Sequence, residues 1–413
     1  MGKDAIVLGA GIVGVSAATH LRQRGWDVVV VDRKGPGEGP SFGNAGLIQR
    51  EAVYPHAFPR DVKELARIAR NTSIDAVYHP LALPGLVSPL LRYWWNSHPE
   101  RYARAVLGAS RLIETCVAEH ESMAEAASVK HMLRPSGWLR VFDDPRALDE
   151  VVRSTEASRR DHGVTFKALD ADGLAAAEPH LMVRRAGAVH FTNSPSVADP
   201  HALVVAYARR LEAIGGQFAT GDAMGLSRTG RGWRVPTADG GVEAGAVVVA
   251  LGAHSVRLTS RFGYSPPLFG ERGYHVHYGM QGNAVLNHPL MDMASGFMLT
   301  PMRAGIRLAT GAEFARLDSV ATPIQLERAE PVARKMLPLG DRVESEPWLG
   351  VRPCMPDMVP VISALPGQAG MWGAFGHGSL GLTLGPSTGR LVAEMMDGAL
   401  PFVDPQPYRA ERF

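Results

Sequence analysis

The first 32 residues restrict the fold of this chain more than any other segment. Residues 5–9 (AIVLG) form an apolar run typical of a buried strand, residues 14–25 have helical spacing, and residues 27–32 (DVVVVD) form a second apolar run. A strand, a helix and a second strand in this order form the repeating unit of parallel sheets. The sequence therefore predicts an α/β fold that begins at the N-terminus.

Three glycines separate the first predicted strand from the predicted helix. Gly9, Gly11 and Gly14 have the spacing G-x-G-x-x-G, in which the first glycine makes a turn, the second admits a pyrophosphate and the third allows close helix packing. Asp32 ends the second strand about 20 residues later, where a carboxylate accepts hydrogen bonds from a ribose. Because a carboxylate repels a 2′-phosphate, we expect a dinucleotide that lacks one. A tight turn without a ligand is the alternative.

The composition argues against several classes of function. The 43 Lys and Arg residues nearly balance the 41 Asp and Glu residues, and the net charge of +2 argues against nucleic-acid binding, which needs a clustered basic face. Cys116 and Cys354 lie far apart, so we expect no disulfide framework and no metal. No uncharged apolar run reaches the ~20 residues that span a bilayer, and the glycine motif leaves no room for a secretion signal. We therefore expect a cytoplasmic protein without a transmembrane segment.

The course of the chain after residue 32 favours FAD over NAD. An NAD-binding domain continues with alternating strands and helices, whereas this chain enters an irregular, proline-containing segment from about residue 51. Strand-like and glycine-rich segments return only at 244–255 (AGAVVVALGAHS) and 376–389 (GHGSLGLTLGPSTG). A flavin ring is embedded in its protein and needs distant segments around it. The sequence therefore predicts that these segments enclose FAD.

Four segments, taken in order, resemble the D-amino-acid oxidase superfamily of FAD-dependent amine oxidoreductases. They are 41–48 (SFGNAGLI), 247–255 (VVVALGAHS), 348–362 (WLGVRPCMPDMVPVI) and 376–396 (GHGSLGLTLGPSTGRLVAEMM). The resemblance is strongest to the bacterial D-amino-acid dehydrogenase small-subunit type, whereas glycine oxidase and sarcosine oxidase are more distant. It runs over nearly the whole chain and is loose over 51–135 and 280–340.

The resemblance implies a two-domain organisation. One domain is a Rossmann-like FAD-binding domain of the glutathione-reductase-like type, and the second is an α+β substrate domain on a mixed or antiparallel sheet. We expect the FAD-binding domain to be discontinuous and formed by 1–50, 196–262 and 345–413, with 51–195 and 263–344 forming the substrate-binding domain. Residues 51–135 depart most from the family and are expected to form a substrate-side lid, so the identity of the substrate stays open.

The segment 376–389 is rich in glycine, and the sequence has to explain why so many positions there lack a side chain. A helix N-terminus carries about half a positive charge and unpaired N–H groups, which would stabilise the negative charge of a reduced flavin. Gly376, Gly378 and Gly381 would let the main chain lie against the ring, and a loop shaped for helix packing is the alternative. Together with the resemblance, these arguments predict an FAD site formed by Gly9, Gly11, Ile12, Val13, Gly14, Asp32, Arg33, Ser41, Asn44, Ala45, Gly46, Leu47, Ala223, Ala250, Gly252, Gly376, Gly378, Ser379, Leu380, Gly381, Leu382 and Thr383.

The predicted FAD is non-covalent. Sarcosine oxidases, which the chain resembles more distantly, tether their flavin to a cysteine in the region of Cys354. The spacing from Cys354 to the following Pro-Asp is shorter here. We therefore expect an inert thiol at this position.

Three side chains are candidates for catalysis. Arg352 matches the arginine of the family's GLRP motif, which implies that it pairs with the substrate carboxylate through its guanidinium fork. A structural arginine that pairs with a nearby acid such as Asp357 is the alternative. Tyr274 is a candidate contact to the substrate, although Tyr274 and His275 alternate on one predicted strand and only one of them can face the pocket. His377 is placed beside the ring, with loop packing as the alternative.

Two further arginines, Arg303 and Arg307, are candidates for a second contact to the substrate. A solvated strand face is the alternative for each of them.

The resemblance implies oxidation of the C–N bond of a D-amino or imino acid, with hydride transfer to flavin N5. The imino product would hydrolyse to a 2-oxo acid and ammonia. Direct hydride transfer requires no protein base, which agrees with the lack of an evident catalytic triad or carboxylate pair. Glycine, sarcosine or another N-methyl amino acid and proline remain alternative substrates. A catalytically silent FAD-binding subunit for electron transfer or assembly is the alternative of a different class.

The electron acceptor stays open at this stage, with oxygen, a quinone or an electron-transfer partner as candidates. Trp94 and Trp95 lie close to Arg92, Arg101 and Arg104. This combination allows weak contact with anionic lipid, so peripheral association with the inner membrane is a further expectation. Aromatic side chains buried in a helical subdomain are the alternative.

Overall fold

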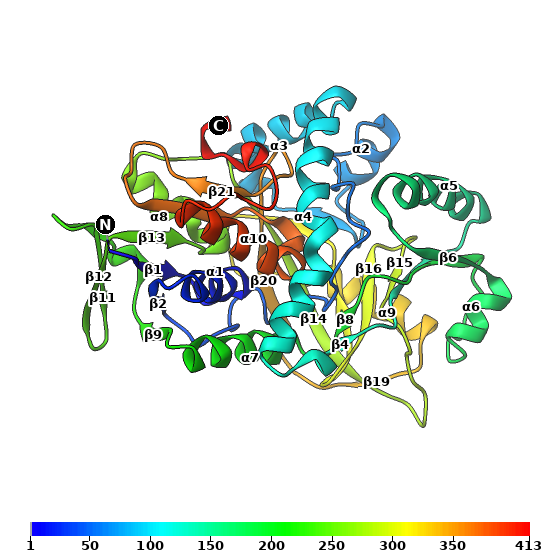
Figure 1. Cartoon of the computed structure of the whole chain (residues 1–413). Helices are drawn as coiled ribbons and strands as arrows, with labels where there is room; N and C mark the ends of the chain where they lie inside the picture. The colour runs from blue at the N-terminus through cyan, green and yellow to red at the C-terminus, as the bar shows by residue number, and fades with distance from the viewer. Residues whose placement is uncertain (1) are drawn as a thin grey trace.

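The computed structural model describes residues 2–413 and contains two main sheets that lie side by side (Figure 1). The first sheet has the order β21-β22-β13-β1-β2-β9, in which only β21 is antiparallel to its neighbour. The predicted strand–helix–strand unit is confirmed, with α1 (Ile12–Gln23) between β1 and β2. The six strands are β1 (Asp4–Leu8), β2 (Asp27–Asp32), β9 (Gln217–Thr220), β13 (Ala246–Val249), β21 (Val361–Ala364) and β22 (Met371–Phe375).

Both faces of this sheet are covered, which explains why its strands are apolar on both sides. Helices α1, α7 (Pro200–Ala213) and α10 (Gly381–Met396) cover one face. The other face packs against α8 (Ser255–Thr259) and a three-stranded sheet of β10, β11 and β12. The sheet is thus the middle layer of a three-layer unit, and the α/β fold predicted from the sequence is confirmed. The bounds of the small sheet are β10 (Ser227–Arg228), β11 (Trp233–Thr237) and β12 (Gly240–Ala244).

The second sheet is mixed and has eleven strands. Its main path is β3-β18-β14-β17-β16-β15-β5-β7-β6, and β19 and β20 also pair with the long strand β14. Helix α9 (Ile324–Met336) packs on one face. The strands are β3 (Ala76–Tyr78), β5 (Trp138–Phe142), β6 (Phe166–Asp170), β7 (Gly187–Phe191), β14 (Phe269–Met280), β15 (Leu290–Asp292), β16 (Phe297–Met302), β17 (Gly305–Ala309), β18 (Ala312–Phe314), β19 (Leu339–Arg342) and β20 (Trp348–Cys354).

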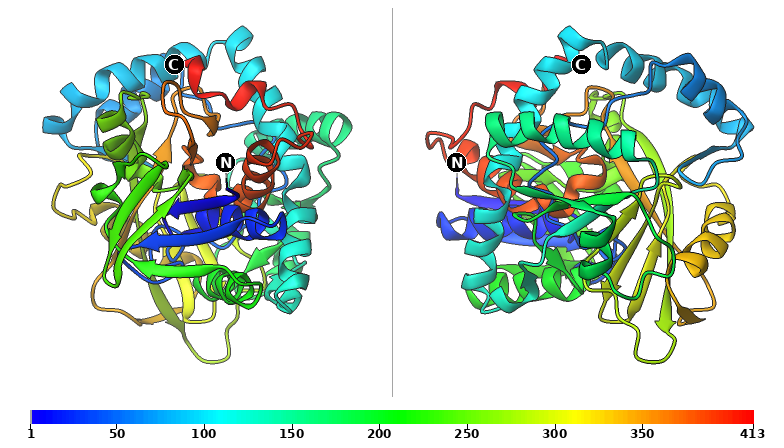
Figure 2. Two further views of the ribbon diagram at one scale, coloured as in Figure 1. Left: turned by 60° about the vertical axis from the view of Figure 1, so that its left-hand side comes forward. Right: turned by 90° about the vertical axis from the view of Figure 1, so that its right-hand side faces the viewer.

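The predicted domain boundaries stay a prediction, and several elements link the predicted domains. Strand β20 lies within the segment 345–413 and pairs with β14 of the eleven-stranded sheet. Helix α4 (Pro99–Ala126) belongs to the segment 51–195 and packs along α10 and α7, as both views of Figure 2 show for α4 and α10. The remaining elements are α2 (Val62–Ala69), α3 (Leu83–Asn96), α5 (Pro145–His162), α6 (Ala171–Ala177) and the pair β4 (Leu133–Arg134) and β8 (Ser196–Val197).

Helices α1 and α10 approach each other closely because both carry small residues at their contact. A Cβ atom added to Gly389 would lie 2.5 Å from the backbone carbon of Ser16, and one added to Gly385 would lie 2.7 Å from Cγ1 of Ile12. Real Cβ atoms do not come this close to a backbone. The glycines of the second half of 376–389 therefore serve helix packing, which was the alternative considered for the segment.

Gly389→Ala is expected to lower the free energy of unfolding by about 1–3 kcal/mol, because the new methyl group meets backbone that has no room to move. Gly85→Ala is the matched control, since Gly85 lies inside α3 and an added Cβ would meet nothing within 4 Å. Because alanine has a higher helix propensity than glycine, Gly85→Ala should leave the free energy of unfolding unchanged or raise it by up to about 1 kcal/mol. Urea unfolding of both variants measures the difference, and equal midpoints would contradict this account of the helix contact.

Candidate cofactor and substrate site

Four segments that are distant in sequence meet at one edge of the six-stranded sheet. Strands β1, β2, β13 and β22 run parallel, so their carboxyl ends open onto the same edge, where open α/β sheets bind ligands. The N–H of Ile12 donates to the Ser41 hydroxyl at 3.1 Å. The Thr383 hydroxyl donates to the Leu47 carbonyl at 3.2 Å and accepts from the N–H of Gln49 at 3.1 Å. These bonds join the glycine motif, the 41–49 loop and the start of α10.

The first glycine motif forms a tight backbone cradle. Gly9 has a φ of +107°, and a Cβ there would lie 2.4 Å from the Ala250 carbonyl oxygen. A Cβ on Gly14 would lie 1.9 Å from the Gly9 oxygen. Helix α1 then begins at Ile12, whose N–H is bound by Ser41, and the N-cap residue Gly11 has no side chain to cover the N–H groups that follow. This arrangement leaves the positive end of α1 accessible to a phosphate.

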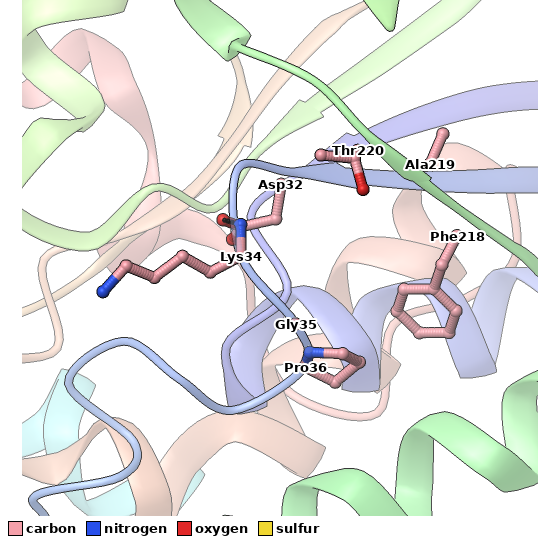
Figure 3. Close-up of a pocket in the computed structure, with 7 residues that line it drawn as sticks. All are labelled: Asp32, Lys34, Gly35, Pro36, Phe218, Ala219 and Thr220. Carbon is pink, nitrogen blue, oxygen red and sulfur yellow. Dashed lines mark hydrogen bonds between the residues drawn. The ribbon is translucent and has the colours of Figure 1, made fainter. Parts of the chain in front are cut away.

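Asp32 is held at the end of β2 beside a small cavity of about 160 Å³ (Figure 3). Its carboxylate accepts hydrogen bonds from the N–H groups of Ala10 at 2.7 Å and Lys34 at 3.0 Å. A carboxylate has about four acceptor sites, so further sites remain for ribose hydroxyls. The cavity is lined by Asp32, Lys34, Gly35, Pro36, Phe218, Ala219 and Thr220.

Around the predicted ribose contact Asp32, the structure adds cavity-lining residues that sequence analysis missed. Lys34 to Pro36 follow Asp32 after a single intervening residue, Arg33, and this closeness in sequence was the available signal. The three residues of β9 had none, because their position follows from the pairing of β9 with β2. Of the predicted contacts, Ala223 packs in an apolar cluster and Arg33 is exposed. Both remain untested predictions.

The loop 41–47 has a fixed shape. Asn44 forms a local turn, with its side-chain oxygen accepting from the N–H of Gly46 at 2.9 Å. Gly46 has a φ of +71°, and a Cβ there would lie 2.2 Å from the Val197 oxygen. The Gly46 carbonyl accepts from the Val197 N–H at 2.7 Å. The turn itself thus accounts for Asn44 and Gly46, and the Gly46 contact with Val197 holds the loop against β8.

The second glycine-rich segment brings the N-terminus of α10 to the same edge. Gly376 and Gly378 have φ values of +89° and +56°. A Cβ on Gly376 would lie 2.5 Å from the Met355 side chain, so this glycine is explained by packing within the protein. A Cβ on Gly381 would meet nothing within 4 Å, and the same holds for Gly252. Open space therefore borders the start of α10 and the end of β13, as a site for a large planar group requires.

A proline inside α10 helps to fix its position. Pro386 has no N–H, so the Leu382 carbonyl one turn earlier has no intrahelical partner. His120 of α4 donates from Nε2 to this carbonyl at 2.7 Å. Burial lowers the pKa of His120 to about 4, so the ring is neutral at neutral pH. The start of α10 is therefore held by α4 as well as by the 47–49 loop.

Side-chain alternation decides which residues of the eleven-stranded sheet face this edge. Tyr274 and Val276 of β14 belong to the apolar cluster on the α9 face. His275 points to the opposite face, where its ring stacks on Trp348 of β20 with centroids 4.9 Å apart, and where it also lies 6.3 Å from the Phe42 ring. This second face of the sheet therefore contacts the 41–47 loop.

Arg352 lies on this second face with its guanidinium against Gly273, where an added Cβ would lie 2.8 Å from Nη2. It donates from Nη1 to the Gly311 carbonyl at 2.8 Å and from Nη2 to the Thr310 carbonyl at 3.0 Å. Asp357 instead pairs with Arg412 at 2.6 Å, so the alternative of an Arg352–Asp357 ion pair is wrong. Within residues 2–413 no carboxylate forms an ion pair with Arg352.

The hydroxyl of Tyr274 belongs to a structural network on the α9 face. It donates to Glu313 at 2.8 Å and accepts from Arg272 and from the N–H of Thr322, also at 2.8 Å. Arg272 and Glu313 form a fully buried ion pair. Tyr274 is thus engaged away from Arg352, and it does not belong to the site proposed below.

His377 is also engaged within the protein. Its Nε2 lies 2.9 Å from the Thr388 hydroxyl of α10, and burial lowers its pKa to about 4. This geometry agrees with loop packing, the alternative considered for His377. Burial likewise raises the pKa of the nearby Cys354 thiol well above its ordinary value, as expected of an inert thiol.

The two remaining arginine candidates have different environments. Arg303 is exposed in the turn between β16 and β17, so it is solvated but does not lie on a strand face. Arg307 is only 4% exposed and contacts the 41–47 loop, so that alternative is wrong for Arg307. Two residues on this face were not singled out from the sequence: His277, which accepts from Arg307, and Trp348, which stacks on His275. The alternation in YHVHY and the tryptophan of WLGVRP were the available signals.

These observations fit FAD. The glycine cradle and the free end of α1 suit a pyrophosphate, Asp32 suits a ribose, and the open backbone at Gly252 and Gly381 provides room beside a second helix N-terminus. Within residues 2–413, no group of three or more His, Cys, Asp or Glu side chains is arranged to hold a metal ion.

Comparison with known proteins agrees with this assignment. A family model described as "FAD dependent oxidoreductase" (DAO) matches residues 4–395. The chain is 30% identical to a D-amino-acid oxidase of Bradyrhizobium diazoefficiens, over 100% of this chain and 99% of the relative. It is also 30% identical to a D-amino acid dehydrogenase of Cereibacter sphaeroides, over 99% and 95% of the two chains.

Solved structures show the same fold at lower identity. Glycine oxidase from Geobacillus kaustophilus is similar with a TM-score of 0.73 at 21% identity, covering 99% of this chain and 98% of that one. L-proline dehydrogenase from P. horikoshii is similar with a TM-score of 0.74 at 19% identity, covering 100% and 98%.

Asp32→Ala is expected to weaken FAD binding about 10- to 100-fold, because it removes charge-assisted hydrogen bonds each worth roughly 1.5–3 kcal/mol. Asp27→Ala is the matched control, since Asp27 begins the same strand and is exposed. The dissociation constant can be measured by titrating apoprotein with FAD and following flavin fluorescence. Equal affinities for the two variants would remove Asp32 from the site.

Proposed function

Since the chain belongs to the DAO family of FAD-dependent oxidoreductases, we propose that it oxidises the C–N bond of a small amino acid, with D-amino acids as the substrate class. The observation that carries this proposal is Arg352, a guanidinium without a carboxylate partner in residues 2–413 on the sheet face that meets the cofactor edge. A substrate carboxylate would supply the missing charge.

The chain positions Arg352 before any substrate arrives. A guanidinium has five N–H donors, and the Thr310 and Gly311 carbonyls engage Nη1 and Nη2. The remaining donors are free to bind a carboxylate, while the two carbonyls fix the orientation of the side chain. Preorganisation of this kind lowers the entropic cost of orienting a substrate.

Bound FAD would supply the acceptor for the hydride removed from the substrate Cα. The protein's contribution would be binding and electrostatics. Arg352 and Arg307 place positive charge on one sheet face, which favours a neutral over a protonated substrate amine. A neutral amine can lend its lone pair to the forming imine, so no side chain needs to remove the Cα proton.

The other readings are separable by experiment. Two similar solved structures are named glycine oxidase and L-proline dehydrogenase, so glycine and proline are included among the substrates to be tested. A catalytically silent subunit would have no use for a carboxylate-binding arginine. The relatives named oxidase and dehydrogenase differ in electron acceptor, so oxygen and a quinone are both to be tested.

Arg352→Ala is expected to raise the KM for the preferred amino acid about 10- to 100-fold while FAD content stays unchanged, because a charge-assisted fork is lost. The KM of Arg352→Lys should lie between those of the unmodified protein and Arg352→Ala, since an ammonium cannot bind a carboxylate in bidentate fashion. Arg303→Ala is the control, because Arg303 is exposed. Steady-state kinetics with D-amino acids, glycine, sarcosine and proline measure these changes, and unchanged kinetics in Arg352→Ala would contradict the proposed role.

Peripheral contact with an anionic membrane surface is a second part of the proposal. No helix in residues 2–413 has the length and apolar character needed to cross a bilayer. Helix α3 lies at the periphery of the molecule (Figure 1) and buries Leu86 and Tyr93 on its inner side. Val87, Leu91 and Trp95 form an outward stripe at a spacing of four residues and are 51%, 60% and 54% exposed.

Basic side chains flank this stripe. The Arg101 guanidinium lies 4.0 Å from the centre of the Trp95 ring, and that of Arg60 lies 4.2 Å from Trp94. Apolar and aromatic residues with flanking arginines are typical of helices that lie in a membrane interface.

Trp95→Ser with Leu91→Ser is expected to reduce co-sedimentation with phosphatidylglycerol vesicles at least several-fold, since area buried in the interface is lost. Leu400→Ser is the control, because Leu400 is 93% exposed and lies near the C-terminus. An equal reduction in both variants, or no sedimentation of the unmodified protein, would contradict membrane contact through α3.

A further inference from the structure

A chain of hydrogen bonds runs from the segment after β19 to the 41–47 loop. The His277 ring contacts Glu344 through Nδ1 at 2.6 Å, and the His277 backbone N–H donates to the same carboxylate at 2.9 Å. Arg307 donates from Nε to His277 Nε2 at 3.0 Å. Its Nη1 donates to the Phe42 carbonyl at 3.2 Å and to the Asn44 carbonyl. We call Glu344, His277 and Arg307 the relay.

The hydrogen-bond partners of His277 determine which of its ring nitrogens carries the proton. A guanidinium only donates, so His277 Nε2 must accept and the ring proton must lie on Nδ1, directed at Glu344. Burial and the Arg307 charge lower the pKa of His277, which agrees with a neutral ring. Burial alone would raise the pKa of Glu344, but hydrogen bonds from His277 lower it below its ordinary value. His275 and Asp199 are the other titratable groups that act on His277.

Arg307 is a buried charge that is balanced indirectly. Burial lowers its pKa to about 10, so the guanidinium stays charged at neutral pH. Within residues 2–413 it forms no direct ion pair, and Glu344 is connected to it only through the imidazole of His277. Burying a guanidinium in this way is costly. The cost indicates a function for the contact that Arg307 makes with the loop.

That contact sets the orientation of two peptide units. In a trans peptide the N–H points opposite to the C=O. Because Arg307 holds the carbonyls of Phe42 and Asn44, the N–H groups of Gly43 and Ala45 point away from it. Neither N–H has a hydrogen-bond partner within residues 2–413, although the adjacent N–H groups of Asn44 and Gly46 both do.

We propose that the relay is a positioning device that orients the Gly43 and Ala45 N–H groups as donors to the bound cofactor. This inference rests on the proposed use of FAD at this edge of the sheet. It assigns Glu344, His277 and Arg307 a role in the affinity and spectrum of the flavin. Arg352, by contrast, is proposed to bind the substrate.

The test uses the purified FAD-bound protein and reads cofactor release and the visible flavin spectrum. His277→Phe is expected to weaken FAD binding about 10- to 100-fold, measured as flavin fluorescence gained on dilution, and to shift the spectrum, because Arg307 loses its acceptor. His277→Gln should largely restore both readouts, since its amide can accept from Arg307 and donate to Glu344. A purely structural role for His277 would not predict this rescue.

Glu344→Gln provides a second variant that keeps the shape of the relay and removes its charge. It is expected to weaken FAD binding about 3- to 10-fold. Glu346→Gln is the matched control, because Glu346 is exposed, lies two residues further along and forms no ion pair within residues 2–413. The unfolding midpoint of each variant shows whether stability has changed as well.

The proposed role of the relay is contradicted if His277→Phe and Glu344→Gln release FAD as slowly as the unmodified protein and have the same flavin spectrum. That result would leave the proposed function intact, because the unmodified protein would still bind FAD and turn over its substrate. An unmodified protein that binds no FAD would instead remove both proposals.

Discussion

The structure depends on close contacts between backbone segments at the carboxyl edge of the parallel sheet. Glycines make these contacts possible because they place no side chain between the segments. The turn after β1 lies against the end of β13 at Gly9 and Ala250, and α1 lies against α10 at Gly389. These contacts bring two helix N-termini to one edge. Each end carries partial positive charge, so together they suit a ligand with a pyrophosphate and a redox ring that becomes negative.

The eleven-stranded sheet contributes the second half of the site through the alternation of its side chains. One face buries Tyr274 and the Arg272–Glu313 ion pair beneath α9, and the other carries Arg352, Arg307 and Trp348 toward the cofactor edge. The division explains why adjacent residues of β14 have unrelated roles. It also separates Arg272, which is paired with Glu313 inside the protein, from Arg352, which forms no ion pair within residues 2–413 and is proposed to bind the substrate carboxylate.

Sequence analysis predicted the first βαβ unit, the meeting of four distant segments and the family, because glycine spacing and buried apolar runs are local signals. It did not predict the two faces of β14 or the partners of Tyr274 and His377, which depend on pairing with β17, β20 and α10. Glu344 had no signal at all, since its role arises from a side-chain contact across the sheet. For Gly376 the structure adds a packing reason, because a Cβ there would lie 2.5 Å from the Met355 side chain, and its contact with the flavin stays a prediction.

The central claim is that this edge holds FAD and that Arg352 delivers an amino acid to it. The most direct measurement is the visible flavin absorption of the purified protein while D-amino acids are added one at a time without oxygen. The account predicts a yellow protein whose absorption is lost with at least one of them and is retained in Arg352→Ala at the same substrate concentration. A colourless protein that FAD does not reconstitute, or a yellow one that no amino acid bleaches, would contradict it.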